Sequence, residues 1–527
     1  MPGPKSDLAA RYGRASIVRD AILHRLEETV RLADPKLLLP LNFQQDTSLP
    51  RAAQSFGLRM MSNLVGAMMM SGFPADIPWA ILENPESIRS SLPPDRMELV
   101  EAFQFRRTMI IHHAMRNGLG SVSKPSPTRF HSGVRRLLRI SAGTGDGLAR
   151  IHDDARWQVF PRRSYVTVRD SCGEEVIHGT KERIDARAMS PEHFEKSGLQ
   201  PSVKDNDDIR AREQDLYTWC EWQPSTGTWV LTQEVNGHET MSETYDVCPY
   251  VSAPYELIDG EDYGRGFVEQ NAGDLETFDF VTNQYKKLLV VLSRCILVKD
   301  ASSGIADDDL NAPDGEVIPG LVRDGKVPGL AMFSSEKNLD TQQVLQGLEF
   351  FRRHLAKSSL IESEMTPVKD RVTAFQVSRI MEEVSKATDG IGPTMTEHVQ
   401  HQAFLFTHRL LQQKKMLPKI PDEKGLNNIV ITTGTNALAM SSRIEKMAQL
   451  LSLTASVLPE SMSIFNQEML ARRWMRYGGV YEPGAIKTAE ERQAEQENAL
   501  RMQAAAAMAQ ALPDAAGKIA VNALQAA

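Results

Sequence analysis

One string in the sequence has the spacing of a phosphate-binding loop, in which backbone amides cradle phosphates and a lysine neutralises their charge. It runs from Gly320 through Gly325 to Lys326 and satisfies GxxxxGK. A phosphate loop continues with Ser or Thr, which ligates magnesium, and then with a helix whose N-terminus faces the phosphates. Here Val327 stands at the hydroxyl position, and Pro328-Gly329 prevents a helix. The segment alternates like a short hairpin, so we expect no nucleotide-binding site.

A second glycine-rich string, Gly143-Thr-Gly145-Asp-Gly147, could be mistaken for a dinucleotide-binding loop. It lacks the third glycine at the spacing that such a loop needs for close helix packing. We therefore predict a loop between a helix and a strand.

Histidine and cysteine side chains are the remaining candidates for metal ligands. His398, His401 and His408 fall in one predicted helix and His112-His113 in another, but no HExxH motif or nearby carboxylate pattern completes a site. The four cysteines lie far apart without a CxxC pair, which argues against zinc and against a disulfide framework. We interpret them as buried small apolar side chains. They are Cys172, Cys220, Cys248 and Cys295.

The motif search therefore predicts no catalytic residue, no metal and no cofactor. Carboxylates are abundant, but one sequence does not show which of them meet in space, so a catalytic pair stays an open alternative.

Composition limits the partners of this chain. It has 527 residues, a net charge of −8 and a pI near 5.9, whereas proteins that grip DNA tightly are basic because phosphate neutralisation drives their affinity. No apolar run reaches the length of a membrane helix, and the first residues lack the apolar core of a secretory signal. We expect a cytoplasmic chain that is not bound to a membrane.

The first half of the chain changes character once. Val18, Ile22, Leu26 and Val30 recur at four-residue steps and predict a helix with one apolar face. From about residue 156 to 252, short β-branched and aromatic runs predict an antiparallel β-rich insert, interrupted by a polar, partly helical segment at 181–210.

Two long helices are predicted on either side of a loop-rich, acidic stretch at 300–338. Each has an apolar stripe at three- and four-residue spacing, typical of a helix that packs along another helix. The stripes are Leu275, Phe278, Thr282, Tyr285, Leu289 and Leu292 in the first helix, and Val344, Leu348, Phe351 and Leu355 in the second.

A third long helix begins with the capping box of Thr373 and Gln376 and is kinked by the glycines and proline at 389–393. A helical block follows at about 437–478. From Thr488 onward the chain is rich in Ala, Glu, Gln and Met. Such a helix buries little alone, so it is either a frayed tail or a member of a multi-chain bundle.

The string at 257–266, LIDGEDYGRG, followed by Gly273-Asp274-Leu275-Glu276, resembles the portal, or head-to-tail connector, proteins of podoviruses. The resemblance continues through Asp370-Arg371-Val372-Thr373-Ala374 and the kinked helix. Cys248-Pro249-Tyr250 and the strand at 164–170, SYVTVRD, are also similar to the family. The resemblance runs intermittently from about residue 10 to 480, and DGExYGR followed by GDL is its most specific part.

The resemblance implies an α+β, mostly α, portal fold assembled as a ring, dodecameric in the family, at one vertex of the capsid. It implies a wing at 1–267, stem helices at 268–296 and 339–360, a small α/β clip at 297–338, a channel loop at 361–372, a kinked wing helix at 373–435, a helical crown at 436–484 and a C-terminal barrel helix or tail at 485–527.

It also implies that double-stranded viral DNA passes through the ring. The basic candidates for contact with DNA are Lys369 and Arg371 in the channel loop, and Lys286, Lys287 and Arg294 on the first stem helix. The clip would bind first the terminase motor and then the tail. Its candidate docking residues are Asp307, Asp308, Asp309, Arg323 and Lys326.

The other implied partners are a tail adaptor protein, the major capsid and scaffolding proteins and internal core proteins, in a virion assembled in the host cytoplasm. Two alternatives stay open. One is an enzyme of nucleic-acid processing with an unrecognised carboxylate or metal site, and the other is a non-viral scaffold that oligomerises through its helices.

Overall fold

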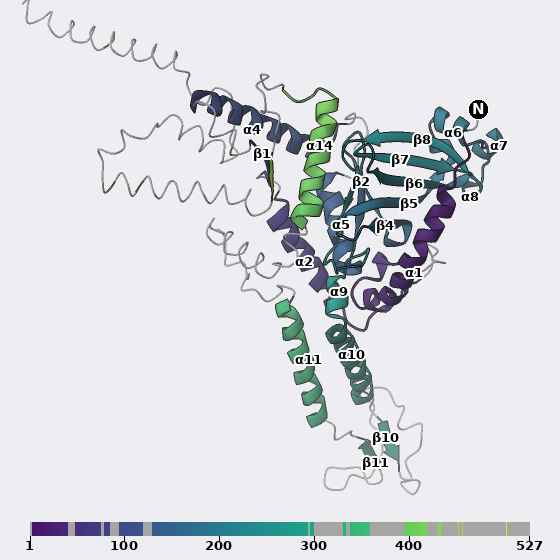
Figure 1. Ribbon diagram of the computed structural model, residues 1–527. Helices are drawn as coiled ribbons and strands as arrows, with labels where there is room; N and C mark the ends of the chain where they lie inside the picture. The colour runs from purple at the N-terminus through teal and green to yellow at the C-terminus, as the bar shows by residue number, and fades with distance from the viewer. Residues whose placement is uncertain are drawn as a thin grey trace, which may run out of the picture. The chain divides into compact units, whose positions relative to one another are not determined.

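The computed structural model describes residues 3–39, 48–74, 78–84, 94–119, 129–293, 296–299, 330–333, 338–358, 395–418 and 430–433, with three isolated residues beyond them. The chain divides into two compact units, residues 1–437 and 438–527, and every helix and strand below belongs to the first. This unit is mixed α and β (Figure 1).

The long helices are α1 (Leu8–Ala33), α2 (Phe56–Gly72), α4 (Pro94–Asn117), α5 (Phe130–Thr144), α10 (Ala272–Ser293), α11 (Asn338–Ser358) and α14 (Gln402–Gln413). The shorter helical segments are η1 (Pro35–Leu37), η2 (Arg162–Ser164), η3 (Ala186–Ala188), α6 (Pro191–Lys196), α7 (Pro201–Lys204), α8 (Ile209–Arg212), α9 (Phe267–Gln270) and the π-helix η5 (Met395–His401). The strands are β1 (Ala80–Glu83), β2 (Leu148–Ile151), β3 (Trp157–Phe160), β4 (Tyr165–Arg169), β5 (Glu175–Asp185), β6 (Glu213–Gln223), β7 (Thr228–Val235), β8 (His238–Tyr245), β9 (Tyr250–Ser252), β10 (Ile296–Lys299), β11 (Leu330–Phe333) and β12 (Val430–Thr433).

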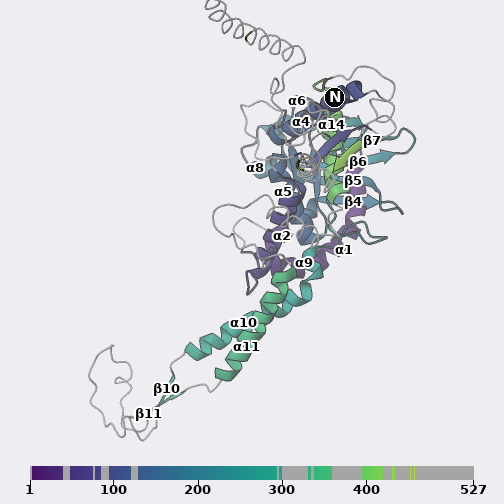
Figure 2. The same ribbon diagram turned by 90° about the vertical axis from the view of Figure 1, so that its left-hand side faces the viewer.

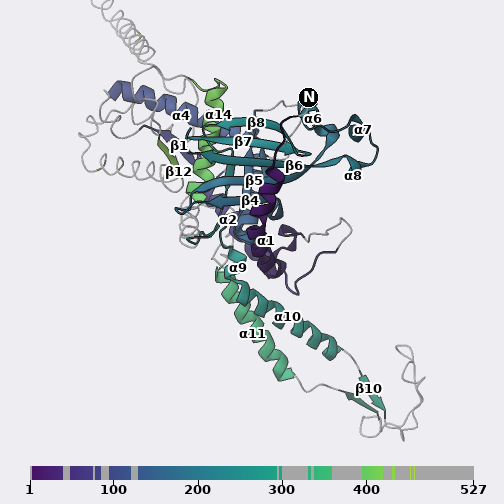
Figure 3. The same ribbon diagram turned by 45° about the vertical axis from the view of Figure 1, so that its right-hand side comes forward.

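The larger sheet has five antiparallel strands in the order β4-β5-β6-β7-β8. Successive side chains on a strand point to opposite faces, so each strand offers one set to either side. Helix α1 lies across one face, against β4 to β7 (Figure 3). Leu8 and Tyr12 of α1 pack there on Val166 and Trp219. The first helix therefore packs on the sheet near its start, and it also contacts α2, α5, α9 and α10.

The smaller sheet has the order β3-β2-β9 and shares a core with the larger one. Leu148 of β2 and Tyr250 of β9 pack with Cys220 and Leu231 of the larger sheet, and Tyr263 from the loop before α9 joins them. These apolar contacts make the two sheets and that loop one packed body.

A layer of helices covers the other side of the smaller sheet. Helix α5 packs against α2, α9 and β3, and Trp79 stacks on its Phe130 with ring centres 5.5 Å apart. Phe404 of α14 meets the same indole edge-on at 6.1 Å. Gly133 of α5 faces the Trp157 side chain so closely that a Cβ there would collide with it. Packing of aromatic rings at these distances stabilises the fold by more than the apolar area that the rings bury.

Helices α10 and α11 form an antiparallel pair beside each other in every view (Figures 1 and 2). His354 near the end of α11 lies 3.6 Å from Asp274 near the start of α10. Along the chain, strands β10 and β11 lie between the two helices and pair antiparallel. Lys299 and Leu330 are partners in this pairing, so the two ends of the segment 300–329 are held together. The predicted stripe residues Val344, Leu348 and Phe351 are half-buried and Leu355 is fully buried.

Two sequence predictions on apolar side chains are wrong in part. Val18 is 54% exposed, because the buried side of α1 follows Tyr12, Leu23, Leu26 and Val30 instead. Leu289 of α10 is 42% exposed although it lies on the predicted stripe.

The cysteine prediction holds for Cys220 and Cys248, which are buried, but Cys172 is exposed in the turn between β4 and β5. The side chain of Cys295 lies outside the described residues.

The strands from β3 to β9 occupy residues 157–252, where the sequence predicts a β-rich insert. The predicted interruption at 181–210 begins too early, because β5 continues to Asp185, and η3, α6, α7 and α8 follow it. The Gly143–Gly147 string is a helix-to-strand loop as predicted: α5 ends at Thr144, Gly145 adopts φ 86°, and β2 begins at Leu148. The capping box at Thr373, the kink at 389–393, the block at 437–478 and the tail from Thr488 lie outside the described residues.

Candidate functional site

The DGEDYGR loop bonds to one edge of the larger sheet, at strand β4. Strand β4 is an edge strand, and edge amides without partners invite pairing with another chain. The backbone N–H of Thr167 donates to the Tyr263 hydroxyl at 3.1 Å, and the N–H of Arg169 donates to Asp262 Oδ1 at 2.9 Å. The loop thus supplies side-chain acceptors where a further strand would supply carbonyls.

Arg169 joins this loop to three other segments. Its guanidinium, in a side chain only 2% exposed, donates to the backbone oxygen of Asp262 at 3.1 Å and to the carbonyl of Gly173 at 3.0 Å. It also donates to Glu175 Oε1 at 2.7 Å and to Ser252 Oγ at 3.1 Å. One buried cation therefore ties β4, β5, β9 and the DGEDYGR loop together.

Glu175 and His178 form a buried ion pair next to Arg169, with Oε2 and Nε2 3.1 Å apart. Burial alone would raise the pKa of Glu175, but attraction to His178 and Arg169 brings that pKa well below its usual range. Burial would lower the pKa of His178, but Glu175 raises it to about 10. His398 of η5 approaches the same carboxylate, with Nδ1 3.9 Å from Oε1. The π-helix η5 thus contacts the sheet through this pair.

Asp146 and Arg162 are fully buried beside this group. Burial raises the pKa of Asp146 to about 6, although Arg169 and Arg162 pull it down. The Arg162 guanidinium lies over the rings of Tyr263 and Tyr165, with its carbon 4.1 and 5.0 Å from their centres. Cation–π contact is strong where water is excluded, so Tyr263 holds Arg162 with its ring while its hydroxyl caps β4.

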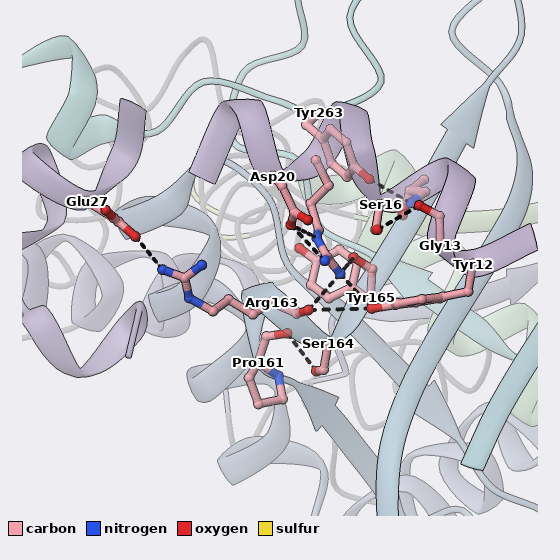
Figure 4. A network of polar contacts seen from close by, with 12 residues as sticks. Tyr12, Gly13, Ser16, Asp20, Glu27, Pro161, Arg163, Ser164, Tyr165 and Tyr263 are labelled. Atoms are coloured by element: carbon pink, nitrogen blue, oxygen red, sulfur yellow. Dashed lines mark hydrogen bonds and ion pairs between the residues drawn. The ribbon is translucent and has the colours of Figure 1, made fainter. Parts of the chain in front are cut away.

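Arg19 is the buried cation on the α1 side, and its partners Tyr12, Asp20, Arg163 and Tyr165 are labelled in Figure 4. Its Nη1 donates to the Tyr12 hydroxyl at 2.5 Å and to the carbonyls of Arg163 and Tyr165 at 2.6 and 3.3 Å. Its other nitrogens reach Asp20 Oδ1, at 2.8 Å for Nη2. The carbonyls that precede and begin β4 are therefore bonded to α1.

The Gly143–Gly147 string and the DGEDYGR loop meet backbone to backbone. The N–H of Tyr255 donates to the carbonyl of Gly145 at 2.9 Å, and a Cβ on Gly145 would collide with the carbonyl of Gly264. With φ 86°, Gly145 also has a conformation that other residues rarely adopt. The glycines serve close packing, which explains their number without any phosphate.

Only two of the predicted DNA-contacting residues lie in the described part. Lys286 and Lys287 are exposed on α10, and Lys286 donates to the carbonyl of Ala53. The other predicted contacts lie outside the described residues: Arg294, Lys369 and Arg371 for DNA, and Asp307, Asp308, Asp309, Arg323 and Lys326 for docking.

His112 and His408, two of the histidines predicted as candidates for metal ligands, lie in the core of the fold. His112 is hydrogen-bonded to the carbonyl of Ala80 at 2.8 Å, and burial lowers its pKa to about 4. Burial lowers the pKa of His408 to about 4 as well. Within the ranges that the structure describes, no three His, Cys, Asp or Glu side chains are arranged to hold a metal ion, and no helix is long and apolar enough to cross a membrane.

Sequence reasoning missed the buried charges Arg19, Asp146, Arg162, Glu175 and His178. One signal was present for Arg19, which shares the helical spacing of Tyr12, Leu23 and Leu26. A similar signal exists for Arg169, because it ends the strand Tyr165–Arg169, whose other side chains are mostly apolar. A charge at an apolar position of a repeating pattern indicates a buried pair.

Arg19 and Arg169 bond to backbone and to side chains of other segments, and Glu175 pairs with Arg169 and His178, so these charges hold strands, a helix and a loop in one arrangement. The site therefore holds segments of the fold together, and the class of protein follows from the family to which the chain belongs. The chain belongs to the family of bacteriophage head to tail connecting proteins, whose model matches residues 6–483. Members of this family are structural components of the virion at the head-to-tail connection, which agrees with the prediction that the chain is not an enzyme.

Individual relatives are distant in sequence but long in coverage. The portal protein of Escherichia phage T7 is 23% identical over 451 residues, which cover 84% of this chain and 80% of that protein. The portal protein of Pseudomonas phage phiKMV is 24% identical over 466 residues, covering 86% and 87%. Among solved structures, a chain of the virion of a native gene transfer agent particle is similar with a TM-score of 0.39 and 10% identity, over 83% of this chain and 90% of that chain.

Proposed function

We propose that copies of this chain assemble into a ring at one vertex of the capsid and that double-stranded viral DNA passes through it during packaging and ejection. The observation that carries the proposal is the α10–α11 pair, which leaves Phe280, Leu345 and Phe350 51–67% exposed. Large apolar side chains on both helices of a projecting pair favour contact with further copies. Membership of the connector family and similarity to portal proteins support it.

In this proposal, α10 and α11 are the stem, within the ranges 268–296 and 339–360, and β10 and β11 close the base of the clip at 297–338. The two sheets, α1, α2, α4 and α5 form the wing. Residues 361–372 face the channel, and the wing helix, crown and barrel follow at 373–435, 436–484 and 485–527.

The ring handles DNA without gripping it. Each chain carries a net charge of −8, so the ring as a whole repels the duplex and keeps it centred. Lys369 and Arg371 then hold it transiently. Lys286 is a weaker candidate because its ammonium is already bonded to Ala53.

The clip residues Asp307, Asp308, Asp309, Arg323 and Lys326 dock the terminase large subunit during filling and a tail adaptor afterwards. The wing and crown meet the major capsid, scaffolding and internal core proteins, and assembly takes place in the host cytoplasm.

Imaging of the purified full chain tests the proposal. Negative-stain micrographs and native mass spectrometry should show closed rings with a central hole. A chain that stays monomeric at high concentration and at every salt concentration would refute the ring.

A further inference from the structure

The α10–α11 pair carries opposite charges on two outward faces, at the same height. Residues four apart on a helix share a face, and those two apart lie on nearly opposite sides. Leu275 and Phe278 of α10 are buried, whereas Glu276 and Phe280 are exposed. Glu276 and Phe280 therefore share the face of α10 that is turned away from its buried stripe.

Helix α11 has the corresponding outward face. Leu355 is buried and Leu348 half-buried on its inner stripe, and Phe350 and Arg353 are both 67% exposed, Arg353 by its side chain. The two outward faces thus each present one phenylalanine and one charged residue.

The charged side chains on these two faces are not fully neutralised by neighbours in the same copy of the chain. Arg353 lies 3.3 Å from the carboxylate of Glu349, but that carboxylate also serves Arg352 at 2.9 Å. The positive charge of Arg353 is therefore only partly compensated. Glu276 is exposed, and no hydrogen bond or ion pair joins it to another described residue, so its negative charge is free to attract a cation of a neighbouring copy.

The contact between Asp274 and His354 fixes how the two helices are aligned. Counting from it along antiparallel helices, Glu276 is level with Arg352 and Phe280 with Leu348. At about 1.5 Å per residue, Glu276 and Arg353, and likewise Phe280 and Phe350, differ in height by only a few ångströms.

We propose that the Glu276–Phe280 face of α10 docks on the Phe350–Arg353 face of α11 in the next copy of this chain. The inference rests on the proposed ring, because rotation about an axis along the helix pair carries each face to its neighbour at unchanged height. The contact is heterologous, so it repeats around the ring and gives it one direction. Phe280 and Phe350 supply the apolar part, and the Glu276–Arg353 pair sets the register. Lys287, on the same face of α10 as Phe280, then lies beside the neighbouring copy and not in the channel.

Charge exchange tests this contact in the full chain. Glu276→Arg and Arg353→Glu should each lower the ring fraction in native mass spectra at least about tenfold, since like charges then face each other at every contact. The double variant restores opposite charges and should recover most of the rings. Asp207→Arg, the same kind of charge reversal on a fully exposed side chain, is the matched control and should leave the rings intact.

Cysteine cross-linking gives an independent readout should a charge variant fold poorly. Glu276→Cys with Arg353→Cys, in a Cys172→Ser background, should form a ladder of covalent multimers under mild oxidation. Either cysteine alone should give no ladder.

The outcomes separate this contact from the ring itself. If the wild type forms rings, three results would overturn the contact but leave the ring. They are single charge variants that still assemble, a double variant that does not recover its rings, and the absence of a cross-linked ladder. A wild-type chain that never forms rings would refute both.

Discussion

Arg169, Glu175 and His178 come from two neighbouring strands and meet where solvent hardly reaches, with side chains 2%, 17% and 0% exposed. A buried charge is tolerated only when a partner and hydrogen bonds replace its water shell. Glu175 serves both cations, so the position of this one carboxylate determines whether two buried charges are compensated. The chemistry of the group is therefore structural, although its shifted pKa values are of the size found in active sites.

Replacing Glu175 should be costly because it leaves two cations without their shared partner. We expect Glu175→Gln to lower the free energy of unfolding by about 3–5 kcal/mol, as for other broken buried pairs. Urea titration followed by tryptophan fluorescence measures this. The neighbouring Glu174→Gln, in an exposed turn, should change it by less than about 0.5 kcal/mol. Equal effects of both variants would contradict the assignment.

Asp146 should make stability depend on pH in the opposite sense to Glu175. Its pKa rises from 3.8 to about 6 on folding, so the folded state binds a proton more tightly and is stabilised as the pH falls through 6. The low pKa of Glu175 costs stability only as the pH falls below its unfolded value of 4.5. Between pH 7 and pH 5, the free energy of unfolding of the wild type should rise relative to that of Asp146→Asn by about 1 kcal/mol. Paired urea titrations at the two pH values would contradict this if the difference between the two proteins stayed constant.

At the scale of elements, side chains from distant segments complete the ends and edges of helices and strands. Asp262 and Tyr263 cap the open edge of β4. The first turn of α1 is capped by Glu234 of β7, whose Oε2 accepts from the N–H of Leu8 at 2.6 Å, while Asp7 at the N-cap position makes no such bond. Helix α1 and the DGEDYGR loop therefore depend on the sheet for their starting geometry.

This dependence gives a test at the start of α1. Glu234→Ala leaves buried amides without an acceptor and should destabilise the helix by about 1–2 kcal/mol. Hydrogen exchange should show faster exchange at the first amides of α1, with little change in β6. Asp7→Ala removes only an exposed ion pair with Arg11 and should cost about 0.5 kcal/mol or less. Faster exchange in Asp7→Ala than in Glu234→Ala would sink the cap assignment.

Periodicity predicted the elements that are regular over many residues. The stripe Val344, Leu348, Phe351 and Leu355 is the less exposed side of α11, and the glycines at 143–147 form the expected loop. It missed the buried charges because pairs such as Asp262 with Arg169 or Glu234 with Leu8 are 93 and 226 residues apart. Spacing along a chain carries no information on such contacts. Val18 was misassigned because each four-residue step advances about 40° around a helix of 3.6 residues per turn, so three such steps carry Val18 away from the face of Leu26 and Val30.

At the scale of the whole molecule, the acidic balance of the chain and its proposed passage of DNA are compatible because a conduit must release what it carries. Every lysine or arginine that contacts phosphate adds affinity through counterion release. A chain with 60 basic and 68 acidic residues keeps that contribution small except where basic groups are placed in the channel. The function proposed for Lys369 and Arg371 follows from this balance.

Neutralising these two residues should weaken the hold on DNA while leaving assembly unchanged. The measurement uses rings that carry Lys369→Gln with Arg371→Gln and short duplex DNA, and it gives the slope of the logarithm of the binding constant against the logarithm of the salt concentration. The magnitude of this slope should fall by about 1 for each phosphate that is no longer neutralised. Filled particles should lose their genomes faster on dilution. Lys414→Gln with Lys415→Gln makes the same charge change on exposed residues at the end of α14 and should have neither effect. The control and the loop variant have the same net charge, so the position of the two lost cations is the only difference between them. Unchanged packaging and genome retention in the loop variant would therefore show that the channel holds DNA by other groups.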